Sequence, residues 1–96
     1  MKGGHPGYLK LLEERVALHI EKSDGYGTAE DPFANYTAVA AARGEPRYLY
    51  ALDRVTEKLV RIRQLHAAGR VDLLEEEFKD CASLFDCATV MLRQDF

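Results

Sequence analysis

Apolar residues recur every three or four positions along two long stretches of this sequence, residues 46–68 and 72–93. That spacing places the apolar side chains on one face of an α-helix. Pro46 is suited to the first turn of the first stretch, and Gly69 is a residue that ends helices. Because the connection between the stretches is short, the sequence predicts an antiparallel pair of helices.

Each of these predicted helices carries one continuous apolar stripe, which we expect to be its packing surface. In residues 46–68 the stripe consists of Tyr48, Leu52, Val55, Leu59, Ile62 and His66. In residues 72–93 it consists of Phe78, Cys81, Phe85, Ala88 and Leu92. We interpret His66 as a structural histidine on this basis. Asp72 and Glu75 have the spacing of a capping box at the start of the second helix.

Two shorter helices are predicted before this pair, at residues 7–22 and 32–43. Asp31 and Pro32 are suited to the start of the second of these, and Gly44 to its end. No long β-like alternation occurs. The sequence therefore predicts an all-α, four-helix bundle that forms a single domain over residues 1–96. A chain of 96 residues buries little surface, so we expect a homodimer or homotetramer.

Charge is unevenly distributed along the chain. The net charge is −3, but residues 43–70 carry +4 and residues 71–96 carry −5. A nucleic-acid-binding domain is usually basic overall, so we expect no nucleic-acid partner. No apolar run is long enough to cross a bilayer, so we expect no membrane association. Cys81 and Cys87 have no metal-binding spacing, and we interpret them as reduced core thiols of a cytoplasmic protein.

Carboxylates recur at helical spacing on the two long helices. Asp53 and Glu57 are four residues apart; so are Glu76 and Asp80, while Glu77 and Asp80 are three apart. Either spacing stacks two carboxylates on one helix face. If the hairpin brings the two sets together, they could hold Mg²⁺ or Mn²⁺, which prefer oxygen ligands. The alternative is that they are solvated surface acids, favoured by the helix dipole in a first turn.

Three cations form a second stripe on residues 46–68. Arg54, Lys58 and Arg61 are spaced four and three apart, beside the carboxylates of the same helix. Guanidinium and ammonium groups bind phosphate oxygens well, so one interpretation is a phosphate-binding face. The other is a solvated face with local ion pairs.

The segment "EKSDGYGTAEDPFANY", residues 21–36, is richer in aromatic residues than a linker needs. One interpretation is that Phe33 and Tyr36 are core residues that anchor a long connection.

Taken in order, these segments resemble a known family. "EKSDGYGTAEDPFANY", "LDRVTEKLVRIRQL" and "EEEFKDCASLFDCATVML" are similar to the small MazG-like all-α proteins of phages and prophages. The resemblance covers about residues 21–92, and "DPFANY" is its most specific part. The family is related to all-α nucleoside triphosphate pyrophosphohydrolases, which use Mg²⁺ to convert an NTP or dNTP to the monophosphate and pyrophosphate.

The resemblance implies a set of site residues. The family's "D-K-x-x-R" falls on Glu57, Lys58 and Arg61, and its last-helix acids fall on Glu76 and Asp80, or on Glu77 and Asp80. Glu57 and Asp80 are the implied catalytic residues. The implied metal ligands are Asp53, Glu57, Glu76, Glu77 and Asp80. The implied nucleotide-binding residues are Lys22, Tyr26, Asn35, Lys58 and Arg61.

The resemblance also gives segment 21–36 a second interpretation, which is a lid over the nucleotide. In that lid Tyr26 or Phe33 would stack on a base, Asn35 would read the base edge and Lys22 would meet a phosphate.

The sequence also departs from the family at several points. Glu57 stands where the family usually has an aspartate, and the double-acid "E-E-x-x-E" of true MazG enzymes is absent from the preceding helix. Gly25 is inserted between Asp24 and Tyr26, and Leu84 stands where the last helix usually has a second aspartate. Loss of that ligand favours an alternative to catalysis, which is a non-catalytic nucleotide-binding protein. A third possibility is a helical oligomer of phage origin that binds another protein, with its carboxylates in solvent. The sequence therefore leaves enzymatic activity open.

Overall fold

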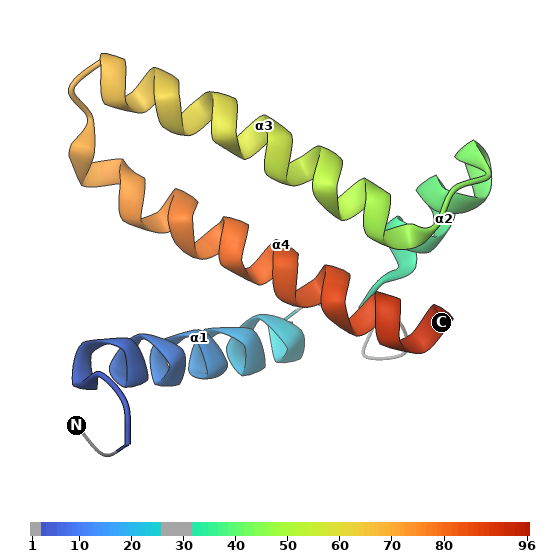
Figure 1. Cartoon of the computed structure of the whole chain (residues 1–96), viewed down its shortest axis with the longest axis horizontal. Helices are drawn as coiled ribbons and strands as arrows, with labels where there is room; N and C mark the ends of the chain where they lie inside the picture. The colour runs from blue at the N-terminus through green and yellow to red at the C-terminus, as the bar shows by residue number, and fades with distance from the viewer. Residues whose placement is uncertain (1–2, 26–31) are drawn as a thin grey trace. The chain divides into compact units, whose positions relative to one another are not determined.

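The computed structural model describes residues 3–25 and 32–96, including the side chains of all but 22–25. The described residues are helical, with no strand among them. The chain divides into two compact units, Met1–Pro32 and Phe33–Phe96 (Figure 1). The predicted all-α class is thus confirmed for the described part of the chain. The arrangement of four helices in one bundle stays a prediction.

The described residues of the first unit contain one helix, α1 (Pro6–Gly25). Pro6 occupies the first helical position, where a missing N–H has no cost. The Nδ1 atom of His5 accepts hydrogen bonds from the backbone N–H groups of Gly7 and Tyr8, at 3.1 and 3.3 Å. These bonds satisfy two of the donors that the start of a helix leaves without a helical partner.

The second unit contains three α-helices. They are α2 (Ala34–Arg43), α3 (Arg47–Ala67) and α4 (Leu74–Asp95), with a 3-10 turn at Val71–Leu73 before α4. Gly44 and Gly69 both have positive φ, at 66° and 72°, which lets the chain reverse after α2 and after α3. The predicted helix ends at these two glycines are confirmed.

The helices α3 and α4 form the predicted antiparallel hairpin, and α2 lies across it near the start of α3 (Figure 1). Four of the core residues lie on these two long helices, and Tyr36 of α2 covers them. The buried cluster is Tyr36, Ala51, Val55, Leu84 and Met91, with Phe33, Tyr50, Cys87 and Ala88 packed against it. Ala51 and Met91 are fully buried. The small side chain of Ala51 allows close approach between the helices.

The buried face of the hairpin differs from the predicted stripes. Val55 is buried as expected, but the other buried residues of α3 and α4 are Ala51, Glu77, Leu84 and Met91. The stripe residues Leu52, Leu59, His66, Phe78, Phe85 and Leu92 are exposed. On α4 the buried residues therefore precede the predicted ones by one position, and on α3 Ala51 is buried in place of Leu52. The prediction was wrong at these positions because apolar residues are neighbours in the sequence and packing selects which of them is buried.

The predicted capping box at the start of the last helix is wrong. Asp72 makes no cap to α4; its carboxylate accepts two hydrogen bonds from Arg70, at 3.1 and 3.0 Å. The 3-10 turn takes up residues 71–73, so α4 begins two residues later than the sequence suggests.

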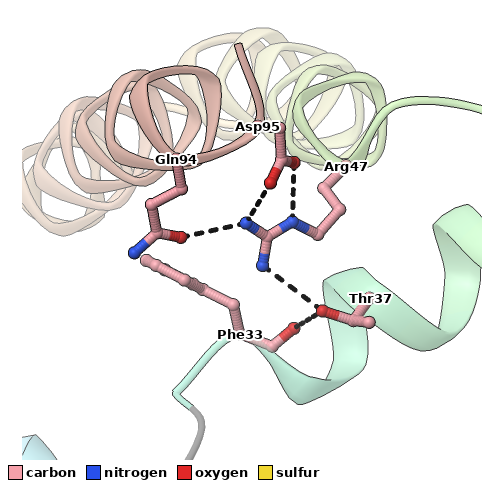
Figure 2. Close-up of polar contacts among 5 residues, drawn as sticks. All are labelled: Phe33, Thr37, Arg47, Gln94 and Asp95. Atoms are coloured by element: carbon pink, nitrogen blue, oxygen red, sulfur yellow. Dashed lines mark hydrogen bonds and ion pairs between the residues drawn. The ribbon is translucent and has the colours of Figure 1, made fainter.

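The ends of the three helices meet in one polar network, shown in Figure 2. Arg47 donates two hydrogen bonds to Asp95, one to Gln94 Oε1 and one to Thr37 Oγ1, and Thr37 in turn donates to the carbonyl of Phe33. The network joins the first residue of α3 to the last turn of α4 and the first turn of α2. It was not foreseen from the sequence, because its members are far apart in the chain.

Among the described residues, no helix has the length and apolar character needed to cross a membrane.

Candidate functional site

The candidate site lies where the middle of α3 faces the first turns of α4. Antiparallel pairing places Lys58 and Arg61 of α3 opposite Glu77 and Asp80 of α4. We call these four residues the charge cluster. Two of them come from the predicted phosphate-binding stripe and two from the predicted metal ligands.

Glu77 is the most deeply placed member of the charge cluster, with only 7% of its surface exposed. Its Oε1 atom accepts a hydrogen bond of 2.7 Å from Arg61 Nε. Its Oε2 atom lies 3.1 Å from Lys58 Nζ, but that contact is an ion pair without a hydrogen bond. Both oxygens of this buried carboxylate therefore face a cation, which is the pairing that a buried charge requires.

Lys58 bridges the two carboxylates of the cluster. Its ammonium group donates a hydrogen bond of 3.0 Å to Asp80 Oδ2 while it contacts Glu77. The hydrogen bond to Asp80, and then the contact with Glu77, raise the pKa of Lys58 despite its partial burial. Lys58 is therefore firmly protonated at neutral pH, and it holds the two carboxylates together.

The ionisation of Glu77 follows from two opposing effects. Burial raises the pKa of its carboxyl group, but the close contact with Lys58 and the hydrogen bond and charge of Arg61 outweigh burial and bring the pKa below the ordinary value of 4.5. Two cations thus face two carboxylates, and the cluster is formally neutral. Such a group can be a structural ion-pair network. Alternatively, a metal ion can replace Lys58 between the carboxylates, which leaves Lys58 and Arg61 able to bind a phosphate.

Three of the predicted metal ligands lie outside the charge cluster. Asp53 is paired with Arg43 at the end of α2. Glu57 is exposed, and no ion pair to it is found among the described residues. Glu76 is exposed, and its nearest cation is Lys79, at 3.9 Å. The structure therefore distinguishes Glu77 from Glu76, a choice that spacing left open.

The predicted lid residues are only partly described. Tyr26 and the side chain of Lys22 lie outside the described residues, and Asn35 is exposed on α2. Tyr36 belongs to the core, where its ring meets the edges of Phe33 and Tyr50 at centroid distances of 6.0 and 5.4 Å. For Tyr36, the interpretation as a core anchor is the one the structure supports.

Arg54, the third cation of the predicted stripe, has a specific partner. Its Nη1 atom donates a hydrogen bond of 2.9 Å to the Tyr36 hydroxyl, and its guanidinium lies 5.8 Å from the centre of the same ring. Burial raises the pKa of Tyr36, although Arg54 opposes this effect. Arg54 therefore ties α3 to α2 rather than standing free beside Lys58. No spacing rule links these two residues, which are 18 positions apart.

The charge cluster offers two carboxylates, Glu77 and Asp80, as ligands for a divalent cation. Glu77 and Asp80 are one helical turn apart and both contact Lys58, so one small cation already lies between them. Within residues 3–25 and 32–96, no group of three or more histidine, cysteine or acidic side chains has metal-binding geometry. Mg²⁺ is often held by one or two carboxylates and completed by water and substrate phosphates, which is the kind of site these residues could supply.

No protein-family model, no curated protein and no solved structure matches the chain.

Proposed function

We propose that this protein binds a nucleoside or deoxynucleoside triphosphate together with Mg²⁺ or Mn²⁺ at the charge cluster. The supporting observation is that Glu77 and Asp80 form ion pairs with Lys58 and Arg61. The MazG-like resemblance assigns the two acids to metal binding and the two cations to phosphate binding. Glu77 Oε2 lies 3.1 Å from the Lys58 ammonium group, so a metal ion that took the place of this group would contact the same oxygen.

In this proposal each residue of the cluster has a distinct role. Glu77 and Asp80 hold the metal, which would neutralise phosphate charge and lower the pKa of a bound water. Lys58 leaves the carboxylates and, with Arg61, contacts the phosphates. Arg61 suits this role because its side chain is 59% exposed and reaches solvent beside Glu77.

The proposed reaction is hydrolysis between the α and β phosphates. Water attacks the α-phosphorus, the bond from that phosphorus to the bridging oxygen breaks, and the water gives up a proton. The products are the nucleoside monophosphate and pyrophosphate. A cytoplasmic setting, in the host if the chain is phage-encoded, belongs to the same proposal.

A non-catalytic nucleotide-binding protein is the second candidate, and one observation favours it. Leu84, which stands where the MazG-like pattern has a second aspartate, is buried in the hydrophobic core. The face of α4 one turn beyond Asp80 therefore offers packing rather than a further metal ligand. Without this second aspartate, the protein would bind a nucleotide but not hydrolyse it.

The test combines thermal melting with an assay for released pyrophosphate. A ligand that binds only the folded state raises the melting temperature. We expect a rise that requires both the metal and one nucleotide. Glu77→Gln and Asp80→Asn should remove that rise and any pyrophosphate release. The matched controls Glu76→Gln, on the same helix, and Asp72→Asn should retain both.

Three results separate the candidates. A nucleotide-dependent rise without pyrophosphate release supports the non-catalytic protein. Equal effects of the Glu76 and Glu77 substitutions would remove the charge cluster from the site. No rise with any pair of metal and nucleotide would overturn both nucleotide proposals and leave the third possibility, a helical oligomer that acts by protein contacts.

We also propose that the chain forms a homodimer or homotetramer. The small buried core of the Phe33–Phe96 unit supports this, because six buried apolar residues are few for a 64-residue unit built from long helices.

A further inference from the structure

One side of the α3–α4 hairpin carries a set of exposed or partly exposed apolar side chains, which we call the open face. Its main residues are Tyr48, Leu52, Leu59, Phe78, Phe85 and Leu92. Tyr48 of α3 and Phe85 and Leu92 of α4 line one shallow depression together, so the two helices contribute to the same surface. The ring of Phe96 lies beside Tyr48, at a centroid distance of 6.2 Å.

The open face is the side of the hairpin opposite α2. The helix α2 contacts α3 through Tyr50 and Arg54, which meet Tyr36. Leu52 lies two residues before Arg54, about 200° away around the helix. The residues that the sequence pattern marks as the main apolar stripes thus lie largely where the unit's own core does not cover them.

The regularity of the open face is that of a helix-packing surface. Phe78, Phe85 and Leu92 recur every seven residues, and Leu52 and Leu59 are seven apart on α3. A seven-residue apolar repeat is the pattern by which helices of separate chains interlock. Scattered surface leucines would not need such a repeat.

The area of the open face matches what a dimer of small chains needs. Tyr48 is partly buried, and the exposed fractions of the other named residues run from 39% for Leu52 to 54% for Phe78. For side chains of this size that leaves roughly 500–600 Å² of apolar surface per chain. Two copies together would bury about 1,000–1,200 Å², at the lower end of specific interfaces.

Charge indicates how two copies would pair. The segment with α3 carries +4 and the segment with α4 carries −5. If two open faces meet about a two-fold axis with α3 of each copy against α4 of the other, opposite charges face each other in both halves. Pairing α3 with α3 would set like charges together.

We propose that the open face is the surface on which a second copy of this chain docks, giving a four-helix dimer with α3 of each copy against α4 of the other. The inference deepens the proposed self-association. It is independent of the charge cluster, because Lys58, Arg61, Glu77 and Asp80 are not part of the open face.

The test is sedimentation equilibrium of the full chain without nucleotide or metal. We expect the wild type to have twice the mass of one chain. Phe85→Glu and Leu59→Glu should each weaken association by more than about tenfold, because each places a charge inside the interface. The matched control is Val90→Glu, an exposed residue of α4 about 140° around the helix from Phe85, and it should leave the mass unchanged.

Circular dichroism of each variant checks that the helices persist, which half-exposed positions should allow. A monomeric wild type would overturn the proposal, as would a Phe85→Glu or Leu59→Glu variant that associates like the wild type. Dissociation by Val90→Glu as well would place the interface on another surface.

The pairing of α3 with α4 has its own test. Arg63 lies one turn after Leu59, at the edge of the open face. Arg63→Glu should weaken the dimer at low salt and have less effect at high salt. An unchanged dimer at low salt would contradict the pairing of basic with acidic helices. Failure of nucleotide binding would leave all of these results untouched, so the two proposals are tested separately.

Discussion

Arg47, the first residue of α3, makes two parallel hydrogen bonds to Asp95, the last residue of α4. Nε donates to Oδ2 at 2.9 Å and Nη2 donates to Oδ1 at 2.8 Å (Figure 2). This is the paired geometry in which guanidinium and carboxylate interact most strongly. Because Arg47 also bonds to Gln94 and Thr37, one side chain fixes the open end of the hairpin and the start of α2.

Replacing Arg47 should destabilise the protein more than replacing another paired arginine. We expect Arg47→Met to lower the free energy of unfolding by about 1–2 kcal/mol, because it removes several charge-assisted hydrogen bonds at once. Arg43→Met is the control, since Arg43 has an ion pair with Asp53 in which both side chains are about half exposed. Exposed pairs contribute about 0–1 kcal/mol. Urea titrations of both variants measure the difference. Equal losses of unfolding free energy would show that the Arg47 network stabilises the fold no more than an exposed ion pair does.

The same ion pair predicts a pH dependence. The hydrogen bond from Arg47 lowers the pKa of Asp95 below its ordinary value of 3.8. A carboxyl group whose folded-state pKa is lowered stabilises the fold above its unfolded pKa, and this contribution disappears as the pH falls through the folded pKa. The difference in melting temperature between the wild type and Asp95→Asn should therefore be greatest near neutral pH and shrink below pH 3.8. A constant difference across that range would contradict this role.

Two adjacent residues of α4 test which face forms the core. Met91 is fully buried, whereas Val90 is 40% exposed. Met91→Ala should lower the free energy of unfolding by about 2–4 kcal/mol through the cavity it leaves. Val90→Ala should change it by less than about 0.5 kcal/mol. Denaturant unfolding at one protein concentration compares the two, and a larger effect at Val90 would mean that α4 is rotated relative to its described position.

Lys58 offers a test that separates the two roles of the charge cluster. In the proposed function its ammonium group occupies the place of a metal ion and later contacts phosphate. Lys58→Met should therefore tighten Mn²⁺ binding and weaken nucleotide binding, with both measured by calorimetry. The control is Lys79→Met, because Lys79 contacts Glu75 and Glu76 outside the cluster. Loss of Mn²⁺ binding in Lys58→Met would show that the carboxylates need Lys58 to stay in place.

Glu77 and Glu76 are neighbours in sequence but differ in environment, so their substitutions should change the free energy of unfolding by different amounts. Glu77→Gln should cost about 1–2 kcal/mol, because a buried charged hydrogen bond to Arg61 and an ion pair with Lys58 are lost. Glu76→Gln should be nearly neutral, since Glu76 is exposed. Thermal melting without metal measures both. A neutral effect at Glu77 would contradict the burial of its carboxylate.

The sequence by itself determined that four helices form and where α2 and α3 end, although α1 runs to Gly25, beyond the predicted residue 22, and α4 begins two residues later than predicted. Apolar spacing marks α1 to α4, and Gly44 and Gly69 mark the two chain reversals, because helical periodicity and positive φ are local properties of the chain. It also identified the residues of the charge cluster, since Lys58 and Arg61, like Glu77 and Asp80, have the spacing that shares a helix face. Their meeting could not be read from spacing.

Only the tertiary structure decided which faces meet. Leu84 and Phe85 are equally apolar neighbours, yet Leu84 is buried and Phe85 is exposed, because the hairpin closes around the small side chain of Ala51 and the flexible one of Met91. The same rotation and register of the two helices place Lys58 against Glu77 and leave Glu57 and Glu76 in solvent. Rotation and register depend on contacts between distant residues, so they follow from packing and not from local pattern.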